Sequence, residues 1–136
     1  MLKQFPLTEL VKAVQANIQK NTDMKCYDVV PKDAVSPFTY IQIVNVENVD
    51  NKTMFMKNHE VWIHVIADST QSSVPIYKLV QTVEEAMTED ITIPDPFILI
   101  MQTDDGLQTI QDEETGEKHA IVVFKFLIAY GFKTKI

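Results

Sequence analysis

Hydrophobic residues recur at helical spacing in two segments, one near the start of the chain and one just past its middle. The first segment runs from Leu7 to Lys20 and the second from Ser73 to Glu89. Because residues three and four apart share one face of a helix, each segment predicts an amphipathic helix. Pro6 and Pro75 stand where a helix tolerates proline, at its first turn. The apolar stripes are Leu7, Leu10, Val11, Val14 and Ile18, then Ile76, Leu79, Val80, Val83 and Met87.

The remaining hydrophobic residues mostly follow the period of two that is typical of strands. Alternation predicts strands over Phe38 to Val46 and over Thr53 to Asp68. In the second strand, one face holds Val61, Ile63, Val65 and Ala67, and the other holds Glu60, Trp62, His64 and Ile66. The segment from His119 to Phe132 is apolar on both faces except at Lys125, which predicts a strand in the middle of a sheet.

Shorter segments complete the predicted order of elements. We expect a short strand from Cys26 to Val30 and a loop or hairpin tip over Glu47 to Lys52. Asp104-Asp105-Gly106 predicts a turn, so Phe97 to Gln102 and Leu107 to Gln111 become two separate strands. The resulting order, α-β-β-β-α-β-β-β, favours an α+β fold in which two amphipathic helices pack on a mostly antiparallel sheet.

Composition limits the size and the partners of the protein. The chain has 136 residues, which predicts a single domain over 1–136. Its 12 basic residues are all lysine, and with 19 acidic residues they give a net charge of −7. Because nucleic-acid binding depends on basic patches and on arginine, we expect no specific nucleic-acid binding. The apolar runs are too short for a membrane span, and a lone cysteine, Cys26, is typical of a reducing cytoplasm.

The sequence offers no convincing catalytic, cofactor or metal site. His59 and His64 are five residues apart on one predicted strand, so they should point to opposite faces and not share a metal ion. Cys26 has only one neighbouring lysine to activate a thiolate. The carboxylates of Asp104 and Asp105 are explained by their predicted turn. We therefore expect no enzyme, and a hydrolase using Cys26 or the acidic turns is the weakest of the hypotheses.

Other residues are better suited to contacts with a partner. Met54-Phe55-Met56 follows a polar loop, and methionine and phenylalanine are adaptable contact residues, although they could equally begin a core-facing strand. Trp62 stands between polar neighbours on its predicted strand face, where it could anchor an interface or pack beneath a helix or the chain terminus. The candidate interface residues are Met54, Phe55, Met56, Trp62, His64, Asp104 and Asp105.

Four stretches together resemble the small tail-completion proteins of phages and prophages, which are head–tail joining or tail-terminator subunits. They are the helix from Leu7 to Lys20; Val29-Val30-Pro31 with the strand entry Ser36 to Ile41; the strand Glu60 to Asp68 with the helix Ile76 to Met87; and the closing strand Ala120 to Tyr130. The resemblance covers nearly the whole chain.

The resemblance implies a non-enzymatic assembly protein without cofactors. Its copies would form a homo-oligomeric ring, possibly of six subunits, that meets phage connector or tail-tube proteins. Asn45 to Lys57 and Thr103 to Lys118 would be long loops reaching these neighbours, and an acidic inner surface would repel passing DNA. Such a protein is cytoplasmic during assembly and then part of the virion. The alternative is a cytosolic α+β module that binds a small ligand or a host protein through the sheet face around Trp62.

Overall fold

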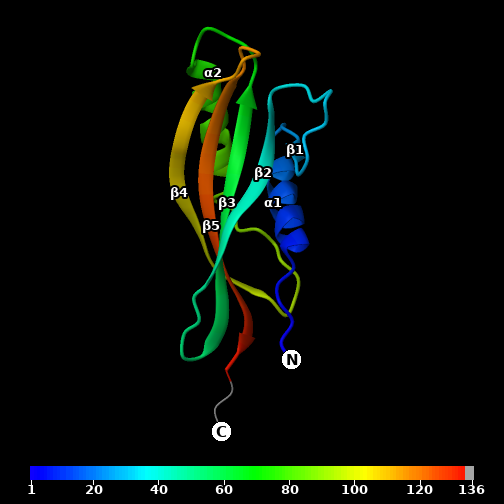
Figure 1. The fold of residues 1–136 in the computed structure, drawn as a ribbon, viewed down its shortest axis with the longest axis vertical. Coiled ribbons are helices and arrows are strands. Elements are labelled where there is room, and N and C mark those ends of the chain that lie inside the picture. Colours follow the sequence, from blue (N-terminus) through cyan, green and yellow to red (C-terminus); the bar gives the residue numbers. More distant parts are fainter. Residues whose placement is uncertain (134–136) are drawn as a thin grey trace.

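A computed structural model describes residues 1–133 as two helices and five strands (Figure 1). The helices are α1 (Leu7–Asn21) and α2 (Val74–Ala86). The strands are β1 (Cys26–Tyr27), β2 (Phe38–Asn48), β3 (Met54–Ala67), β4 (Ile98–Asp112) and β5 (Lys118–Phe132). The structure confirms both predicted helices and the predicted long strands β2, β3 and β5. Their ends differ from the predicted ends by only a few residues.

The five strands form one sheet in the order β1-β2-β3-β5-β4. Only the short β1 pairs in parallel, with β2, and every other pairing is antiparallel. The strand predicted to be central, β5, lies between β3 and β4, which explains why it is apolar on both faces. The predicted α+β class, with a mostly antiparallel sheet, is confirmed.

Both helices bury their apolar stripes against the same face of the sheet. Leu10, Val14 and Ile18 of α1 are fully buried, as are Ile76 and Val83 of α2. On the sheet side, this core takes Val61, Ile63, Val65 and Ala67 of β3, together with Ala120, Val122, Phe124, Phe126 and Ile128 of β5. In Figure 1, α2 lies behind β3, β5 and β4, so the opposite face of these strands carries no helix.

The prediction of two strands between Phe97 and Gln111 is wrong. Asp104, Asp105 and Gly106 lie inside one continuous strand, β4, and the element order becomes α-β-β-β-α-β-β. The pairing of β4 with β5 shifts register between Asp104 and Gly106, and Gly106 has a positive φ of 94°. An Asp-Gly pair thus forms a β-bulge here, because glycine accepts the left-handed conformation that a bulge needs as readily as a turn does.

The two connections predicted as long loops are also shorter than expected, because the strands beside them are longer. Of the stretch from Thr103 to Lys118, only residues 113–117 connect strands, because β4 runs to Asp112 and β5 begins at Lys118. Of the stretch from Asn45 to Lys57, only residues 49–53 connect β2 to β3. The predicted strand over Cys26 to Val30 also shrinks, to the two residues of β1.

Candidate assembly interface

The helix-free face of the sheet carries Trp62 and His64, two of the residues that the sequence singled out. Trp62 pairs across strands with Gln42 and Val123, and His64 pairs with Tyr40 and Ile121. Directly paired residues of antiparallel strands project to the same face, so all of these side chains share it. We call this surface, centred on Trp62, the open face.

Trp62 is half-buried on the open face. Its indole Nε1–H donates a hydrogen bond to Glu60 Oε2 at 3.0 Å, and its ring centroid lies 6.3 Å from that of His64. No helix within residues 1–133 covers it, and its side chain still has surface available for a partner. An amphipathic ring fixed by a hydrogen bond loses little conformational freedom on binding, which suits an anchor residue.

His64 is buried in a polar network that the sequence analysis missed. Its Nδ1 lies 2.7 Å from Nε2 of His119, and its Nε2 lies 3.0 Å from Oε1 of Gln42. His119 Nδ1 in turn lies 2.6 Å from Glu113 Oε1 in the β4–β5 turn. The Tyr40 ring stacks on His64, with centroids 4.2 Å apart and planes only 6° apart. The alternation of β5 could have placed His119 on this face, but not its pairing with His64.

The network ends at Gln42 on one side and at Glu113 on the other. Burial, followed by repulsion from His119, lowers the pKa of His64 to about 4, so His64 is neutral near pH 7. The hydrogen bond from His119 is the largest cause that lowers the pKa of Glu113.

His59 lies on the opposite face of β3, as the five-residue spacing predicted. Its Nδ1 is 3.1 Å from the Phe126 carbonyl oxygen, and its ring packs edge-on against Phe5. Burial is the main cause of its lowered pKa. His59 is therefore a core residue beneath the N-terminal segment.

Met54, Phe55 and Met56 begin β3 at the far end of the sheet from His64. Met56 is buried, whereas Met54 and Phe55 are half-buried. The Phe55 ring lies 5.9 Å from that of Tyr130, and Lys133 Nζ is 5.1 Å from its centroid. Met56 therefore belongs to the core, and Met54 and Phe55 are the members of the trio with surface left for a partner.

Asp104 and Asp105 are exposed on β4, an outer strand of the sheet, and far from a turn tip. Asp105 Oδ2 lies 3.5 Å from Lys125 Nζ, and Asp104 Oδ1 accepts a hydrogen bond from the Gly106 amide. Burial and then the Asp104 charge raise the pKa of Glu84 on α2. Two carboxyl groups thus face each other here, and no lysine pairs with either of them in residues 1–133.

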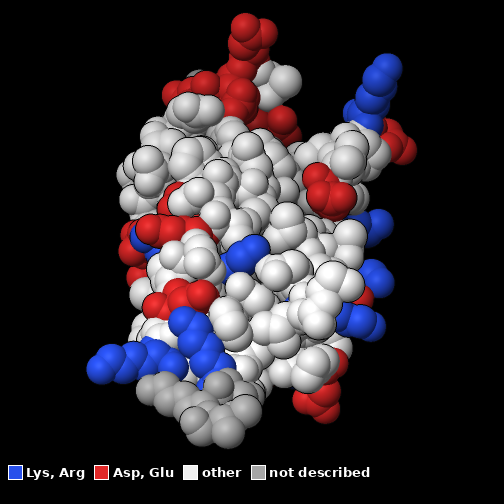
Figure 2. Space-filling model, turned by 60° about the horizontal axis from the view of Figure 1, so that its bottom comes forward, with Lys and Arg blue, Asp and Glu red and all other residues white. Residues whose placement is uncertain are grey.

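Acidic residues dominate one side of the molecule. Residues 68–117 hold 12 of the 19 acidic residues and one lysine, which makes this stretch −11, and it includes α2, β4 and the β4–β5 turn. Figure 2 shows acidic side chains gathered at the upper end of the molecule, where Figure 1 draws the β4–β5 turn. Part of the acidic composition is therefore concentrated at this end of the molecule.

Catalytic chemistry finds no support in the described residues. Burial raises the pKa of the Cys26 thiol to about 11, opposite to what a thiolate nucleophile needs. No group of three or more His, Cys, Asp or Glu side chains within residues 1–133 is arranged to hold a metal ion. Among these residues there is also no helix both long and apolar enough to cross a bilayer.

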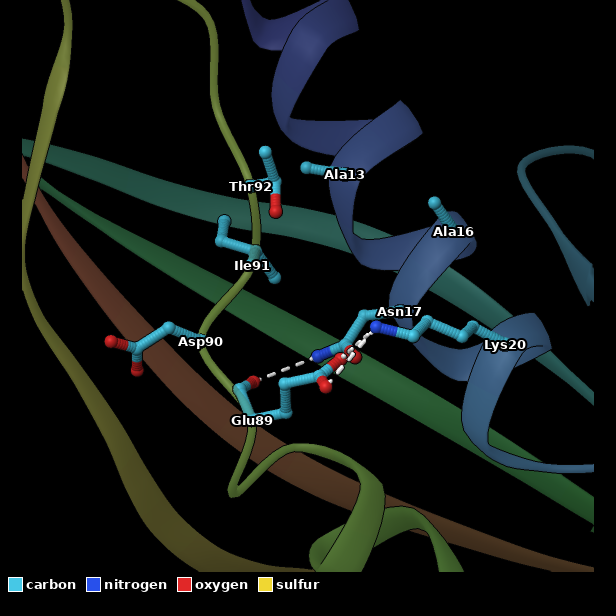
Figure 3. Close-up of a pocket in the computed structure, with 8 residues that line it drawn as sticks. All are labelled: Ala13, Ala16, Asn17, Lys20, Glu89, Asp90, Ile91 and Thr92. Carbon is cyan, nitrogen blue, oxygen red and sulfur yellow. Dashed lines mark hydrogen bonds and ion pairs between the residues drawn. The ribbon is translucent and has the colours of Figure 1, made fainter.

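A small hollow between α1 and the segment after α2 is a structural joint (Figure 3). Its volume is about 90 Å³, too small for a typical ligand. Asn17 Nδ2 donates to the Glu89 carbonyl oxygen at 2.9 Å, and Lys20 Nζ lies 3.2 Å from the Glu89 carboxylate. These bonds tie α1 to the chain that leaves α2.

Comparison with known proteins agrees with this geometry. Residues 1–136 match a phage tail terminator family that is described as "Putative tail termination protein". The chain belongs to this family. The resemblance found in the sequence is thereby confirmed, and the family's role is structural, not enzymatic. No curated protein matches the chain.

A solved structure shares the fold of this tail terminator family member. It is a chain from "Virion of native gene transfer agent (GTA) particle", with a TM-score of 0.75 and 16% sequence identity. The match covers 90% of this chain and 96% of the other. At this identity the likeness establishes the fold.

Proposed function

We propose that this tail terminator family member closes the end of a phage tail as one subunit of a homo-oligomeric ring, with six copies expected. Membership of the tail termination family over residues 1–136 is the observation that carries the proposal. The ring would contact tail-tube protein on one side and connector proteins on the other. It would assemble in the cytoplasm and stay in the virion.

The architecture supports a role in assembly. The sheet has an open face with a half-buried Trp62 and a hydrogen-bonded histidine pair, and its outer strand β4 presents an unpaired edge. A subunit in a ring must contact two neighbours through two different surfaces, and an open face plus an exposed edge provide more than one such surface. Trp62, Phe55, Asp104 and Asp105 remain our candidates for these contacts.

The acidic side of the molecule suits the path of DNA through such a ring. We assign the 68–117 surface, with its net charge of −11, to the inner wall or its rim. Phosphates would be repelled there, so DNA would pass without binding. A structure of the assembled ring with these residues on its outer circumference would rule out this assignment.

The direct test is the mass of the purified protein in solution, alone and after addition of the tail-tube protein from the same phage. Light scattering coupled to size-exclusion chromatography should find a species of six times 15.6 kDa in at least one of the two conditions. A strictly monomeric protein in both conditions would contradict the ring.

A further inference from the structure

A groove crosses the open face beside the β4–β5 turn. Its volume is about 530 Å³, which is large enough for a side chain or a short segment of a partner. Phe38 of β2 pairs with Ile66 of β3, which places both on the open face with Tyr40. The other lining residues are His119 of β5, Val30 of the β1–β2 connection, and Glu113, Glu114, Thr115 and Glu117 of the turn. We call this site the turn groove.

The part of the turn groove that the sheet forms is apolar and aromatic. Phe38 and Ile66 are buried, and Tyr40 is half-buried. Stacking on His64, with ring centroids 4.2 Å apart, fixes the Tyr40 ring. An aromatic ring attracts a cation over its face, and the aliphatic stem of lysine or arginine packs well on apolar surface. This surface therefore suits a long side chain with a cationic head.

Hydrogen bonds hold the β4–β5 turn in place beside this surface. The Glu113 amide donates to the Glu117 carbonyl oxygen at 2.8 Å, and the Gly116 amide donates to the Glu113 carbonyl oxygen at 2.9 Å. Glu113 Oε1 also lies 2.6 Å from Nδ1 of His119 on β5. The turn is therefore ordered before a partner binds, which lowers the entropic cost of binding.

The turn side of the groove is acidic and has no neutralising lysine. Glu113 is bonded to His119, and no lysine in residues 1–133 forms an ion pair with Glu114 or Glu117. Lys118, the next residue in the sequence, is instead paired with Asp112 at 2.7 Å. Glu114 and Glu117 are therefore the two carboxylates available to a cationic partner.

The opposite side of the groove is acidic as well. Residues 28–37 of the β1–β2 connection hold two acidic residues, Asp28 and Asp33, against one lysine, Lys32. Acidic residues on both sides repel an acidic partner and the phosphates of DNA. The part of the chain that the structure describes has no cluster of three or more metal-ligating side chains, which argues against a metal ion as the occupant. Charge complementarity therefore selects a lysine or arginine side chain of a partner protein.

We propose that the turn groove binds a segment of the tail-tube protein that carries lysine or arginine. The aliphatic stem of that residue packs on Tyr40, and its cationic head lies beside Glu114 and Glu117. This inference rests on the proposed function and names the chemistry by which the protein recognises its partner. Only the turn carboxylates take part, so the acidic residues of α2 and β4 stay available for the inner wall.

A Glu114→Gln/Glu117→Gln variant tests the groove, because it removes both charges and keeps the shape of the side chains. Glu113 stays unchanged, since it holds the turn through His119. Affinity for the tail-tube protein of the same phage, measured by calorimetry, should fall about tenfold with the loss of two exposed ion pairs.

The matched control is Glu47→Gln/Asp90→Asn, which changes the net charge equally at two exposed positions outside the groove. Its affinity should stay within about twofold of the wild type. An equal loss in both variants would overturn the groove and leave the proposed function intact. Loss of connector binding or of self-association in the Glu114→Gln/Glu117→Gln variant, with tail-tube binding unchanged, would overturn the choice of partner. A wild type that binds neither tail-tube nor connector protein would instead contradict the proposed function.

A peptide probe tests the chemistry of the groove without a partner protein. The probe is a capped pentapeptide of alternating lysine and leucine, added at millimolar concentration to the isotope-labelled protein. The amide NMR signals of Tyr40, Thr115 and Glu117 should shift, and a peptide of alternating glutamate and leucine should leave them unchanged. No shift in the groove, or equal shifts at the exposed Asp104 and Asp105 of β4, would overturn the proposal whatever the tail-tube protein does.

Discussion

His64 and His119 show how much one residue depends on its neighbours across the sheet. Alone, each is an ordinary ionisable side chain. Placed 2.7 Å apart and bounded by Gln42 and Glu113, they form one hydrogen-bonded network that ties the β4–β5 turn to the open face. A buried network of this kind stabilises a fold only while all its donors and acceptors are matched.

This network predicts acid sensitivity. Because the folded state lowers the pKa of His64 from 6.5 to about 4, the unfolded chain binds protons more readily between these values. Stability should therefore fall as pH drops through this window. His64→Gln should reduce stability at pH 7 but flatten the fall towards pH 5, as measured by urea unfolding at both pH values. The lowered pKa of His59 destabilises the wild type and the His64→Gln variant in the same direction as the pH drops. An equal fall in the stability of the two proteins from pH 7 to pH 5 would therefore contradict the assignment of acid sensitivity to His64.

Trp62 predicts a separation between folding and assembly. Trp62→Ala should weaken subunit association by about 2 kcal/mol or more, since an anchoring tryptophan contributes that much at an interface. Its loss should affect monomer stability less, because the ring is only half-buried. Concentration-dependent light scattering and thermal unfolding check the two quantities. An equal loss in both would mark Trp62 as a core residue instead.

At the scale of elements, the β4–β5 turn depends on a glycine in a left-handed conformation. Gly116 has φ of 85°, and a Cβ there would lie 2.5 Å from Ser69 Oγ in the β3–α2 connection. Gly106, in the β4 bulge, has φ of 94° but open space around it. Comparing substitutions at the two glycines therefore distinguishes the stability cost of backbone strain from that of a steric clash.

We expect Gly106→Ala to cost about 1 kcal/mol of stability through backbone strain alone. Gly116→Ala should cost more, because the Ser69 side chain must also move. Chemical denaturation of the two variants gives the comparison, and Gly116→Ala/Ser69→Gly should recover the difference. Equal costs for both glycines would show that the contact with Ser69 is unimportant.

The joint between α1 and the segment after α2 also belongs to this scale. Asn17 is buried, and its amide is bonded to the Glu89 carbonyl oxygen. Asn17→Ala leaves that acceptor without its donor and should cost about 1–3 kcal/mol. Lys20→Ala is the matched control, because its bonds to the Glu89 carboxylate are exposed and should matter less. Urea unfolding measures the loss of stability in both variants, and a larger loss for Lys20→Ala would contradict this ranking.

For the whole molecule, net charge opposes association of like copies. Each chain carries −7, so copies repel one another at long range. Raising the salt concentration from about 0.05 to 0.15 M screens the repulsion and should strengthen self-association. Sedimentation equilibrium in the two buffers measures this. Weaker association in the higher salt would mean that ion pairs, not apolar contacts, hold the copies together.

Sequence patterns suffice to predict the two helices, the long strands and the α+β class. Periodicity is a local property, and a helix or strand that buries one face repeats its apolar residues at a fixed spacing. The same patterns carried the resemblance to tail-completion proteins. They also placed His59 and His64 on opposite faces of β3, since that follows from five residues of strand alone.

Tertiary structure alone decided that Asp104-Asp105-Gly106 is a bulge and that His64 meets His119. An Asp-Gly pair suits a turn and a bulge equally, and only continuous pairing with β5 distinguishes them. His64 and His119 are 55 residues apart, and their contact depends on the register of two strands, which no local pattern specifies.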